Sequence, residues 1–147
     1  MTTMDISQSR TADHTSCRLA HRPEAVGHAR RIARPLLHSW RVGEDASASV
    51  LLVLSELVTN AVVHARPPLA LHLHLHREHA DLRVWIAVTD GGPATRTGRW
   101  AATRAHDEHG RGLFLIDTLA ISHGTCMHGG GSITHWARLR APARTAA

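Results

Sequence analysis

The stretch LLVLSELVTNAVVHA, residues 51–65, decides the fold, because its apolar residues recur at steps of three and four. This spacing is typical of an amphipathic helix with one buried face. We expect the helix to begin after an N-cap at Asp45 and to run to about Ala65, where Arg66-Pro67-Pro68 ends it. The predicted buried side consists of Val50, Leu51, Leu54, Leu57, Val58 and Ala61.

A strand and another helix are expected upstream of this segment. The strand covers Ser16 to His21, and the amphipathic helix follows from Pro23 to about Trp40. Pro35 lies inside that helix, where its ring removes a hydrogen bond and clashes with the preceding turn. We therefore expect a kink or a break near residues 31–34.

Two strands are expected downstream, because apolar and polar residues alternate over 69–76 and again over 82–89. A long loop over residues 94–109, a short helix from about Leu113 to Ala120 and a last strand from Ile133 to Leu139 follow. This order of elements predicts an α+β fold, in which a two-layer α/β sandwich carries its helices on one face of the sheet.

Composition indicates one globular domain of 147 residues, expected over 16–140 between tails at 1–15 and 141–147. The chain contains neither an apolar run long enough to span a bilayer nor an N-terminal signal pattern, so we expect a cytoplasmic protein without a membrane partner. All 17 basic residues are arginine and are scattered along the chain. Despite the net charge of +5, this distribution argues against direct binding to nucleic acid.

Glu56 and Asn60 form the first of three polar clusters. They are four residues apart, so they share one face of the predicted helix at the border of its apolar stripe. Their oxygen atoms suit Mg²⁺, and a carboxylate there can act as a general base. The alternative is an ordinary exposed glutamate beside an asparagine inside a helix.

Asp90 begins the second cluster, DGGPA, at the end of a predicted strand. By strand alternation its carboxylate faces the helical layer, where it can accept a hydrogen bond from an amino group such as that of adenine. Gly91 and Gly92 allow close backbone approach, although a simple turn after a strand has the same composition.

Gly110, Arg111 and Gly112 form the third cluster, directly before the predicted helix at 113–120. Free N–H groups at a helix start bind phosphate oxygens, and Arg111 adds a permanent positive charge. A glycine before a helix is common by itself, but the three clusters in this order predict a nucleotide site.

The segments ELVTNAVVHA, DGGPA and GRGLFLIDTLA resemble the N box and the two glycine boxes of the Bergerat-fold (GHKL) ATPases, the superfamily of gyrase, MutL and histidine-kinase catalytic domains. Within it, the chain is most similar to the anti-sigma-factor serine/threonine-kinase branch. The resemblance covers residues 16–140 and implies a mixed, mostly antiparallel sheet with ATP and Mg²⁺ as cofactors.

The same resemblance implies roles for individual residues. Asn60 would coordinate Mg²⁺, Glu56 would be the catalytic base, and Asp90 would pair with the adenine amine. Gly92 would lie under the base, and residues 94–109 would form a lid over phosphates held by the third cluster. The full expected nucleotide set is Asn60, Asp90, Gly92, Ala94, Gly110, Arg111, Gly112, Leu113 and Thr134.

The chain departs from the family pattern at the adenine end. His123 stands where relatives usually carry tryptophan, and Ser132-Ile133 stands where Gly-Lys is common. The absence of lysine also leaves phosphate neutralisation to arginines such as Arg99, Arg104 or Arg111.

His72, His74 and His76 alternate along one strand and could converge on a metal such as Zn²⁺. Because the matching leucines form the core, these histidines are expected on the sheet face away from the nucleotide, together with Trp85. We expect at most adventitious metal binding there, and a surface of this kind can also receive a protein partner.

Two functions are compatible with this pattern. In the first, the protein is an ATP-dependent kinase that phosphorylates a serine or threonine of an anti-sigma antagonist. In the second, it is an ATP-responsive binding module that sequesters a sigma factor or another regulator without catalysis. Both require the same pocket, both imply a protein partner, and both allow a homodimer.

Overall fold

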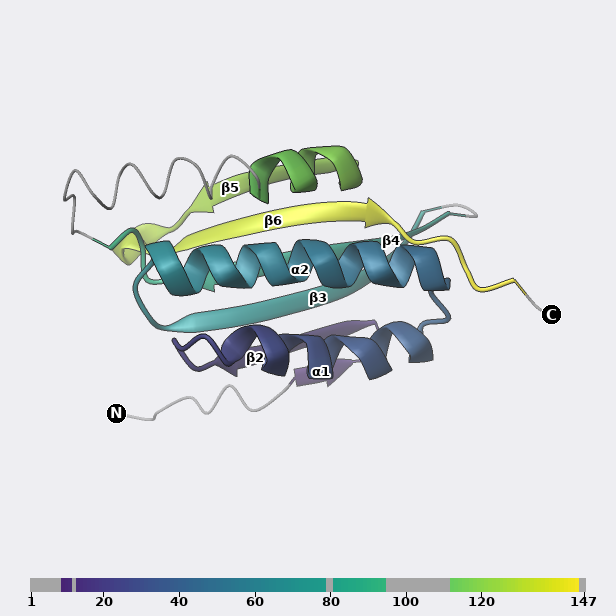
Figure 1. The fold of residues 1–147 in the computed structure, drawn as a ribbon, viewed down its shortest axis with the longest axis horizontal. Coiled ribbons are helices and arrows are strands. Elements are labelled where there is room, and N and C mark those ends of the chain that lie inside the picture. Colours follow the sequence, from purple (N-terminus) through teal and green to yellow (C-terminus); the bar gives the residue numbers. More distant parts are fainter. Residues whose placement is uncertain (1–8, 12, 79–80, 95–111, 146–147) are drawn as a thin grey trace.

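The computed structural model describes residues 9–11, 13–78, 81–94 and 112–145. The secondary-structure elements follow one another as Figure 1 shows. They are β1 (Ser9–Thr11), β2 (His14–Leu19), α1 (Ala25–Ser39), α2 (Glu44–His64), β3 (Leu69–Glu78), β4 (Asp81–Asp90), a helix at 112–119, β5 (Ser122–Met127), the 3-10 turn η1 (Gly129–Gly131) and β6 (Ile133–Arg140).

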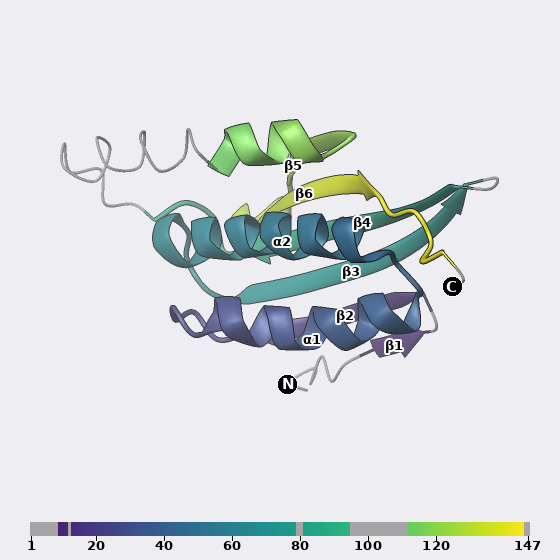
Figure 2. The ribbon, with the colours of Figure 1, turned by 45° about the vertical axis from the view of Figure 1, so that its right-hand side comes forward.

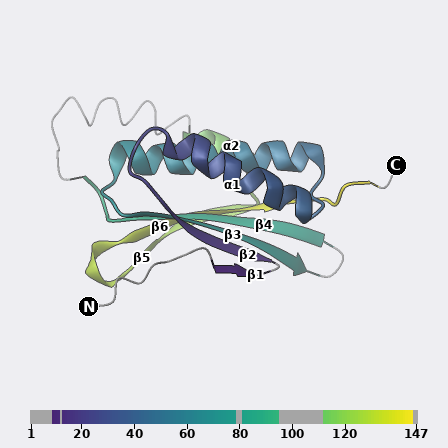
Figure 3. The ribbon, with the colours of Figure 1, turned by 90° about the horizontal axis from the view of Figure 1, so that it is seen from below.

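The strands form one six-stranded sheet in the order β1-β2-β3-β4-β6-β5. Every pairing in the described part of the chain is antiparallel. The helices all lie on one face of this sheet (Figure 3), and α2 lies between α1 and the helix at 112–119 (Figures 1 and 2). The predicted α+β sandwich with helices on one face is therefore confirmed.

The hydrophobic core lies between α2 and the sheet, where the apolar side of the helix packs against the apolar face of the strands. One side of α2 is buried, and the leucines of β3 and alternate residues of β4 face it. The predicted apolar faces are buried at Val50, Leu54, Leu57, Val58 and Ala61 on α2, Leu69, Leu71, Leu73 and Leu75 on β3, and Val84, Ile86 and Val88 on β4. Leu51 and Leu82, which were also predicted on these faces, are only partly buried.

By length and composition alone, α2 could cross a membrane, since its mean hydropathy is 1.8. The same composition is found in the core helices of globular domains. In this fold α2 contacts α1, β4 and β6, and its buried residues belong to the hydrophobic core. Its apolar character is accounted for by this packing.

The structure departs from the local predictions about the helices at two points. The N-cap of α2 is Gly43 in extended conformation, and Asp45 lies in the first turn, where its charge still suits the helix dipole. Helix α1 continues through Pro35 to Ser39, so the chain does not break there, which was one of the two expected outcomes. The buried residues Ala29, Ala33 and Leu37 lie on both sides of the proline, so packing against the core holds the helix together.

Strand β5 was not predicted, because most of its side chains are exposed and no apolar alternation marks it. Backbone pairing also extends beyond both ends of the expected domain at 16–140. At the N-terminal side, β1 and the start of β2 lie within the expected tail. At the C-terminal side, the N–H of Gly43 donates to the carbonyl of Pro142 at 2.9 Å, and the N–H of Arg144 donates to Arg41 at 2.7 Å.

Candidate functional site

A cavity of about 250 Å³ lies where the C-terminal half of α2, the end of β4 and the helix at 112–119 meet β5 and β6. Its floor and walls are apolar, with Leu57, Leu113 and Ile116 among the lining residues. The polar side chains that line it are Asn60, His64, Asp90, His123, Thr125 and His135. Two of the three predicted clusters therefore contribute directly to one pocket, through Asn60 and Asp90.

The first and third clusters meet at Gly112, the first residue of the helix at 112–119. A Cβ atom placed on Gly112 would lie 2.9 Å from Glu56 Oε2 and 3.6 Å from Asn60 Nδ2. A side chain here would require the Glu56 carboxylate to shift, while the Asn60 amide would be in van der Waals contact with it. The structure thus brings Glu56 and Asn60 to the start of the helix that was expected to bind phosphate.

Asp90 is only 2% exposed, and both oxygens of its carboxylate have neighbours. The N–H of Gly92 donates to Oδ1 at 2.7 Å, and His135 Nε2 lies 3.4 Å from Oδ2. A buried carboxylate needs such partners, since its transfer out of water is otherwise costly. Asp90 lines the cavity as predicted, so its acceptor atoms face the helical layer.

The loop after Asp90 is fastened to the end of α2 by backbone hydrogen bonds. The N–H of Gly91 donates to the carbonyl of Arg66 at 2.7 Å, and the N–H of Arg66 donates to Gly92 at 2.8 Å. A Cβ atom on Gly91 would lie only 2.2 Å from the carbonyl oxygen of Pro67. The absence of a Cβ atom at Gly91 therefore allows the loop to pack closely on the backbone of residues 66–67.

Gly92 and Ala94 hold the remainder of the loop. Gly92 has φ +98°, and a Cβ atom there would lie 2.6 Å from the carbonyl oxygen of Gly131 in η1. The N–H of Ala94 donates to the carbonyl of His64 at 3.0 Å. Both residues therefore fix the geometry around Asp90, and the N–H of Gly92 is already used by that carboxylate.

Thr134 does not lie with Asp90, which corrects the prediction from the sequence. On β6, Ile133 pairs with Asp90 and Thr134 pairs with Thr89, so alternation directs Thr134 to the opposite face of the sheet. Its hydroxyl shares hydrogen bonds of 2.7 Å with Thr89 Oγ1 and with His128 Nε2 on that face.

His135 occupies the position beside Asp90 and was missed in the sequence. Besides its contact with Asp90, it hydrogen-bonds through Nδ1 to Thr125 Oγ1 at 3.4 Å. Alternation along β6 could have found it, because His135 shares a face with the buried residues Ala137 and Leu139. His123, which replaces the usual tryptophan, lies at the pocket edge and is 3.3 Å from Asp117.

Other parts of the predicted site lie outside the described residues. These are Gly110, Arg111 and residues 95–109, which include Arg99 and Arg104. Leu113 is described, and it lines the cavity from the first turn of its helix.

The chemistry of Glu56 and Asn60 fits a magnesium ion. Mg²⁺ is usually bound through one or two protein oxygens together with water and substrate phosphates. Glu56 and Asn60 both lie near Gly112. They therefore provide protein oxygens at the start of the helix, where phosphates were expected to bind. By contrast, among the side chains described, no group of three His, Cys, Asp or Glu residues could hold a metal ion, and this includes His72, His74 and His76.

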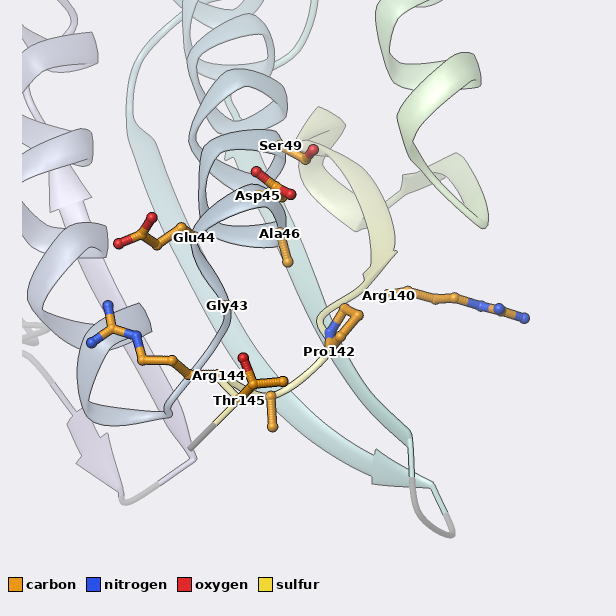
Figure 4. A pocket seen from close by; sticks show the side chains of 10 residues that line it. Gly43, Glu44, Asp45, Ala46, Ser49, Arg140, Pro142, Arg144 and Thr145 are labelled. Atoms are coloured by element: carbon orange, nitrogen blue, oxygen red, sulfur yellow. The ribbon is translucent and has the colours of Figure 1, made fainter. Parts of the chain in front are cut away.

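A separate hollow of about 640 Å³ lies at the other end of α2 (Figure 4). It is bordered by Glu44 and Asp45 in the first turn of α2 and by Arg140 and Arg144 near the C-terminus. Figure 4 shows the side chain of Arg140 pointing away from these acidic residues. No described residue of the three clusters lines this hollow, so it is not the candidate site.

Comparison with known proteins agrees with the geometry. Residues 19–133 match the family described as the histidine kinase-like ATPase domain. The chain belongs to this family. The resemblance to the Bergerat-fold ATPases is thereby confirmed, and ATP is the ligand that a histidine kinase-like ATPase domain implies. No curated protein matches the chain by sequence.

A solved structure shares the fold of this histidine kinase-like ATPase domain. It is the crystal structure of the RsbU and RsbW domains of Rv1364c from Mycobacterium tuberculosis, with a TM-score of 0.63 and 21% sequence identity. The match covers 90% of the present chain and 34% of that chain, so the present chain spans about a third of the length of that protein.

Proposed function

We propose that this protein binds Mg-ATP in the cavity beside α2 and transfers the γ-phosphate to a serine or threonine of a protein antagonist, as in the anti-sigma-factor kinases. The observation that carries the proposal is the meeting of Glu56, Asn60 and Gly112 at one point. A carboxylate, an amide oxygen and a helix start at one place form a suitable environment for a magnesium-bound phosphate.

Asp90 and His135 recognise the base in this proposal. Asp90 accepts a hydrogen bond from the amino group of adenine, while His135 stands 3.4 Å away and can donate to the adjacent ring nitrogen. In the tautomer in which the Thr125 hydroxyl donates to Nδ1 of His135, the proton is on Nε2, which is the nitrogen near Asp90. The apolar walls around Leu57 and Ile116 cover the faces of the ring.

Asn60 holds Mg²⁺ at the phosphate end of the cavity. Bound Mg²⁺ supplies positive charge to the phosphate oxygens and aligns them for transfer. The backbone N–H groups at the start of the helix at 112–119 add hydrogen-bond donors to the same oxygens. The arginine that neutralises the remaining phosphate charge is Arg111 of the third cluster or a lid arginine such as Arg99 or Arg104.

Glu56 acts as the general base. It is half-buried, so its carboxylate can be reached by a hydroxyl of a docked protein. It accepts the proton of that hydroxyl, the oxygen attacks the γ-phosphorus, and ADP leaves. The reaction produces a phosphoserine or phosphothreonine and needs no other co-reactant.

The partner is a sigma factor or its antagonist, and the protein acts in the cytoplasm, where a homodimer would present two such sites. The resemblance of the three sequence clusters supports this assignment. The structural neighbour from Mycobacterium tuberculosis supports the fold alone. If the protein only sequesters its partner, the pocket would bind ATP without transfer.

Substitution of Glu56 separates the two functions. A partner captured from the native host would be incubated with labelled Mg-ATP and either the parent protein or Glu56→Gln. The kinase proposal predicts phosphate on the partner with the parent and at least a hundredfold slower transfer with Glu56→Gln, at similar ATP affinity. No transfer by the parent, with ATP and partner both bound, would establish the sequestering module instead.

A further inference from the structure

A second cavity lies on the sheet face opposite the helices. This face carries no helix in the part of the chain that the structure describes (Figure 3). The cavity measures about 760 Å³, within the range of about 300–1,000 Å³ that ligand pockets have. Among the described residues, its lining shares only Trp136 with that of the cavity beside α2, and it includes Trp85, Trp136, Arg138, Thr89, Thr134 and His72.

Two indole rings flank the cavity from neighbouring central strands. Trp136 of β6 lies opposite Ala87 of β4, and Trp85 of β4 lies opposite Arg138 of β6. The two tryptophans are therefore diagonal neighbours, with the small side chain of Ala87 beside them. Trp136 also packs against Gly124, whose Cβ position would lie 2.9 Å from Trp136 Cζ2. Rigid aromatic walls with a small residue between them leave room for a flat molecule.

Arg138 provides the charge in this cavity. Its Nε atom is buried and has no hydrogen-bond partner among the described residues. The described residues that line the cavity include no aspartate or glutamate to neutralise it. A buried N–H donor that lacks an acceptor favours a ligand that supplies one, and a guanidinium group matches a carboxylate in shape and charge.

A row of polar groups borders the same cavity. The hydroxyls of Thr89 and Thr134 share a hydrogen bond of 2.7 Å, Thr134 bonds His128 at 2.7 Å, and Ser16 bonds His72 at 2.8 Å. Burial, with a smaller contribution from His14, lowers the pKa of His72 and keeps its ring uncharged. These groups can hydrogen-bond polar substituents on a ring without adding a competing charge.

We propose that this far-face cavity is a second ligand site, which binds a small planar aromatic carboxylate. The ring lies against Trp85 and Trp136, and the carboxylate accepts hydrogen bonds from Arg138. The two cavities share Trp136 but lie on opposite faces of the sheet, because Asp90 and Thr134 point to opposite sides.

Calorimetric titration of the full chain with 2-naphthoate tests this proposal, with 2-naphthalenemethanol as the uncharged probe of the same shape. We expect 2-naphthoate to bind one site at least tenfold more tightly than the alcohol, both with and without saturating ATP. Arg138→Met is expected to remove this preference. Arg140→Met is the matched control, since Arg140 is exposed, lies two residues along the same strand and does not line the cavity.

Trp85→Leu provides a second variant, because Trp85 lines the far-face cavity and not the ATP cavity. It should weaken both probes while ATP affinity stays unchanged, and circular dichroism would verify that each variant is folded. The proposal is overturned if the two probes bind with equal affinity, or if Arg138→Met or Trp85→Leu binds 2-naphthoate like the parent. It is likewise overturned if ATP displaces 2-naphthoate. It is also overturned if sedimentation shows a dimer that Trp85→Leu dissociates, because the face would then be a subunit interface.

Discussion

His135 Nε2 lies 3.4 Å from Asp90 Oδ2, so a buried carboxylate and an imidazole stand side by side at the base of the ATP cavity. Together they offer an acceptor and a donor to an entering base. In the proposed function this pair recognises adenine, whereas Thr134 lies on the other face of the sheet.

Replacement of His135 by valine is therefore expected to weaken ATP binding about threefold to tenfold, which corresponds to the loss of one hydrogen bond of about 0.5–1.5 kcal/mol. Thr134→Val is the matched control on the same strand, and its ATP affinity should equal that of the parent. Calorimetry with Mg-ATP measures both. Equal losses in the two variants would contradict the assignment of faces on β6.

Gly112→Ala is expected to lower ATP affinity at least tenfold, because its methyl group would lie 3.6 Å from Asn60 Nδ2, in the space that the proposal assigns to the magnesium-bound phosphates. Gly129→Ala is the control, since nothing lies within 4 Å of its Cβ position. Nucleotide titrations of the two variants provide the comparison. If Gly112→Ala bound ATP like the parent, Glu56 and the helix start would not act at one site.

Leu54→Ala tests the packing of α2 on the sheet. Leu54 is completely buried, so its truncation should lower the free energy of unfolding by about 2–5 kcal/mol. Leu52→Ala, two residues away, removes a side chain that is 43% exposed and should cost less than about 1 kcal/mol. Urea denaturation of both variants measures the difference, and similar midpoints would show that α2 does not pack as described.

The two cysteines should differ in reactivity. Burial raises the pKa of the Cys17 thiol, so at a pH near 8 less of it is in the reactive thiolate form, whereas Cys126 is exposed. A disulfide reagent should therefore modify one thiol per native chain quickly and the second only after denaturation. The Cys126→Ser variant should lose the fast phase, and retention of that phase would contradict the buried position of Cys17 on β2.

The sequence predicted the parts of this fold that depend on periodicity. The helical spacing of residues 51–65 gave the buried side of α2, and strand alternation gave the orientation of Asp90. Each of these two predictions concerns a single segment with one buried face. The pattern of apolar residues within that segment is therefore sufficient to make the prediction.

The remaining features depend on contacts between segments. Alternation within β6 separates Thr134 from His135, but which of them lies beside Asp90 depends also on the register of β6 against β4, which a single strand does not reveal. Edge strand β5 has few buried side chains, so it has no apolar alternation to detect. The continuity of α1 at Pro35 and the cap of α2 at Gly43 likewise reflect tertiary packing that outweighs local preference.

The central claim is that Asp90, Asn60 and the start of the helix at 112–119 form one Mg-ATP site, and calorimetric titration with ATP tests it most directly. The account predicts that one ATP binds per chain and that removal of Mg²⁺ weakens this binding. It also predicts that Asp90→Asn binds ATP at least tenfold more weakly while its circular dichroism spectrum is unchanged. ATP affinity that is the same for the parent and Asp90→Asn, with and without Mg²⁺, would contradict it.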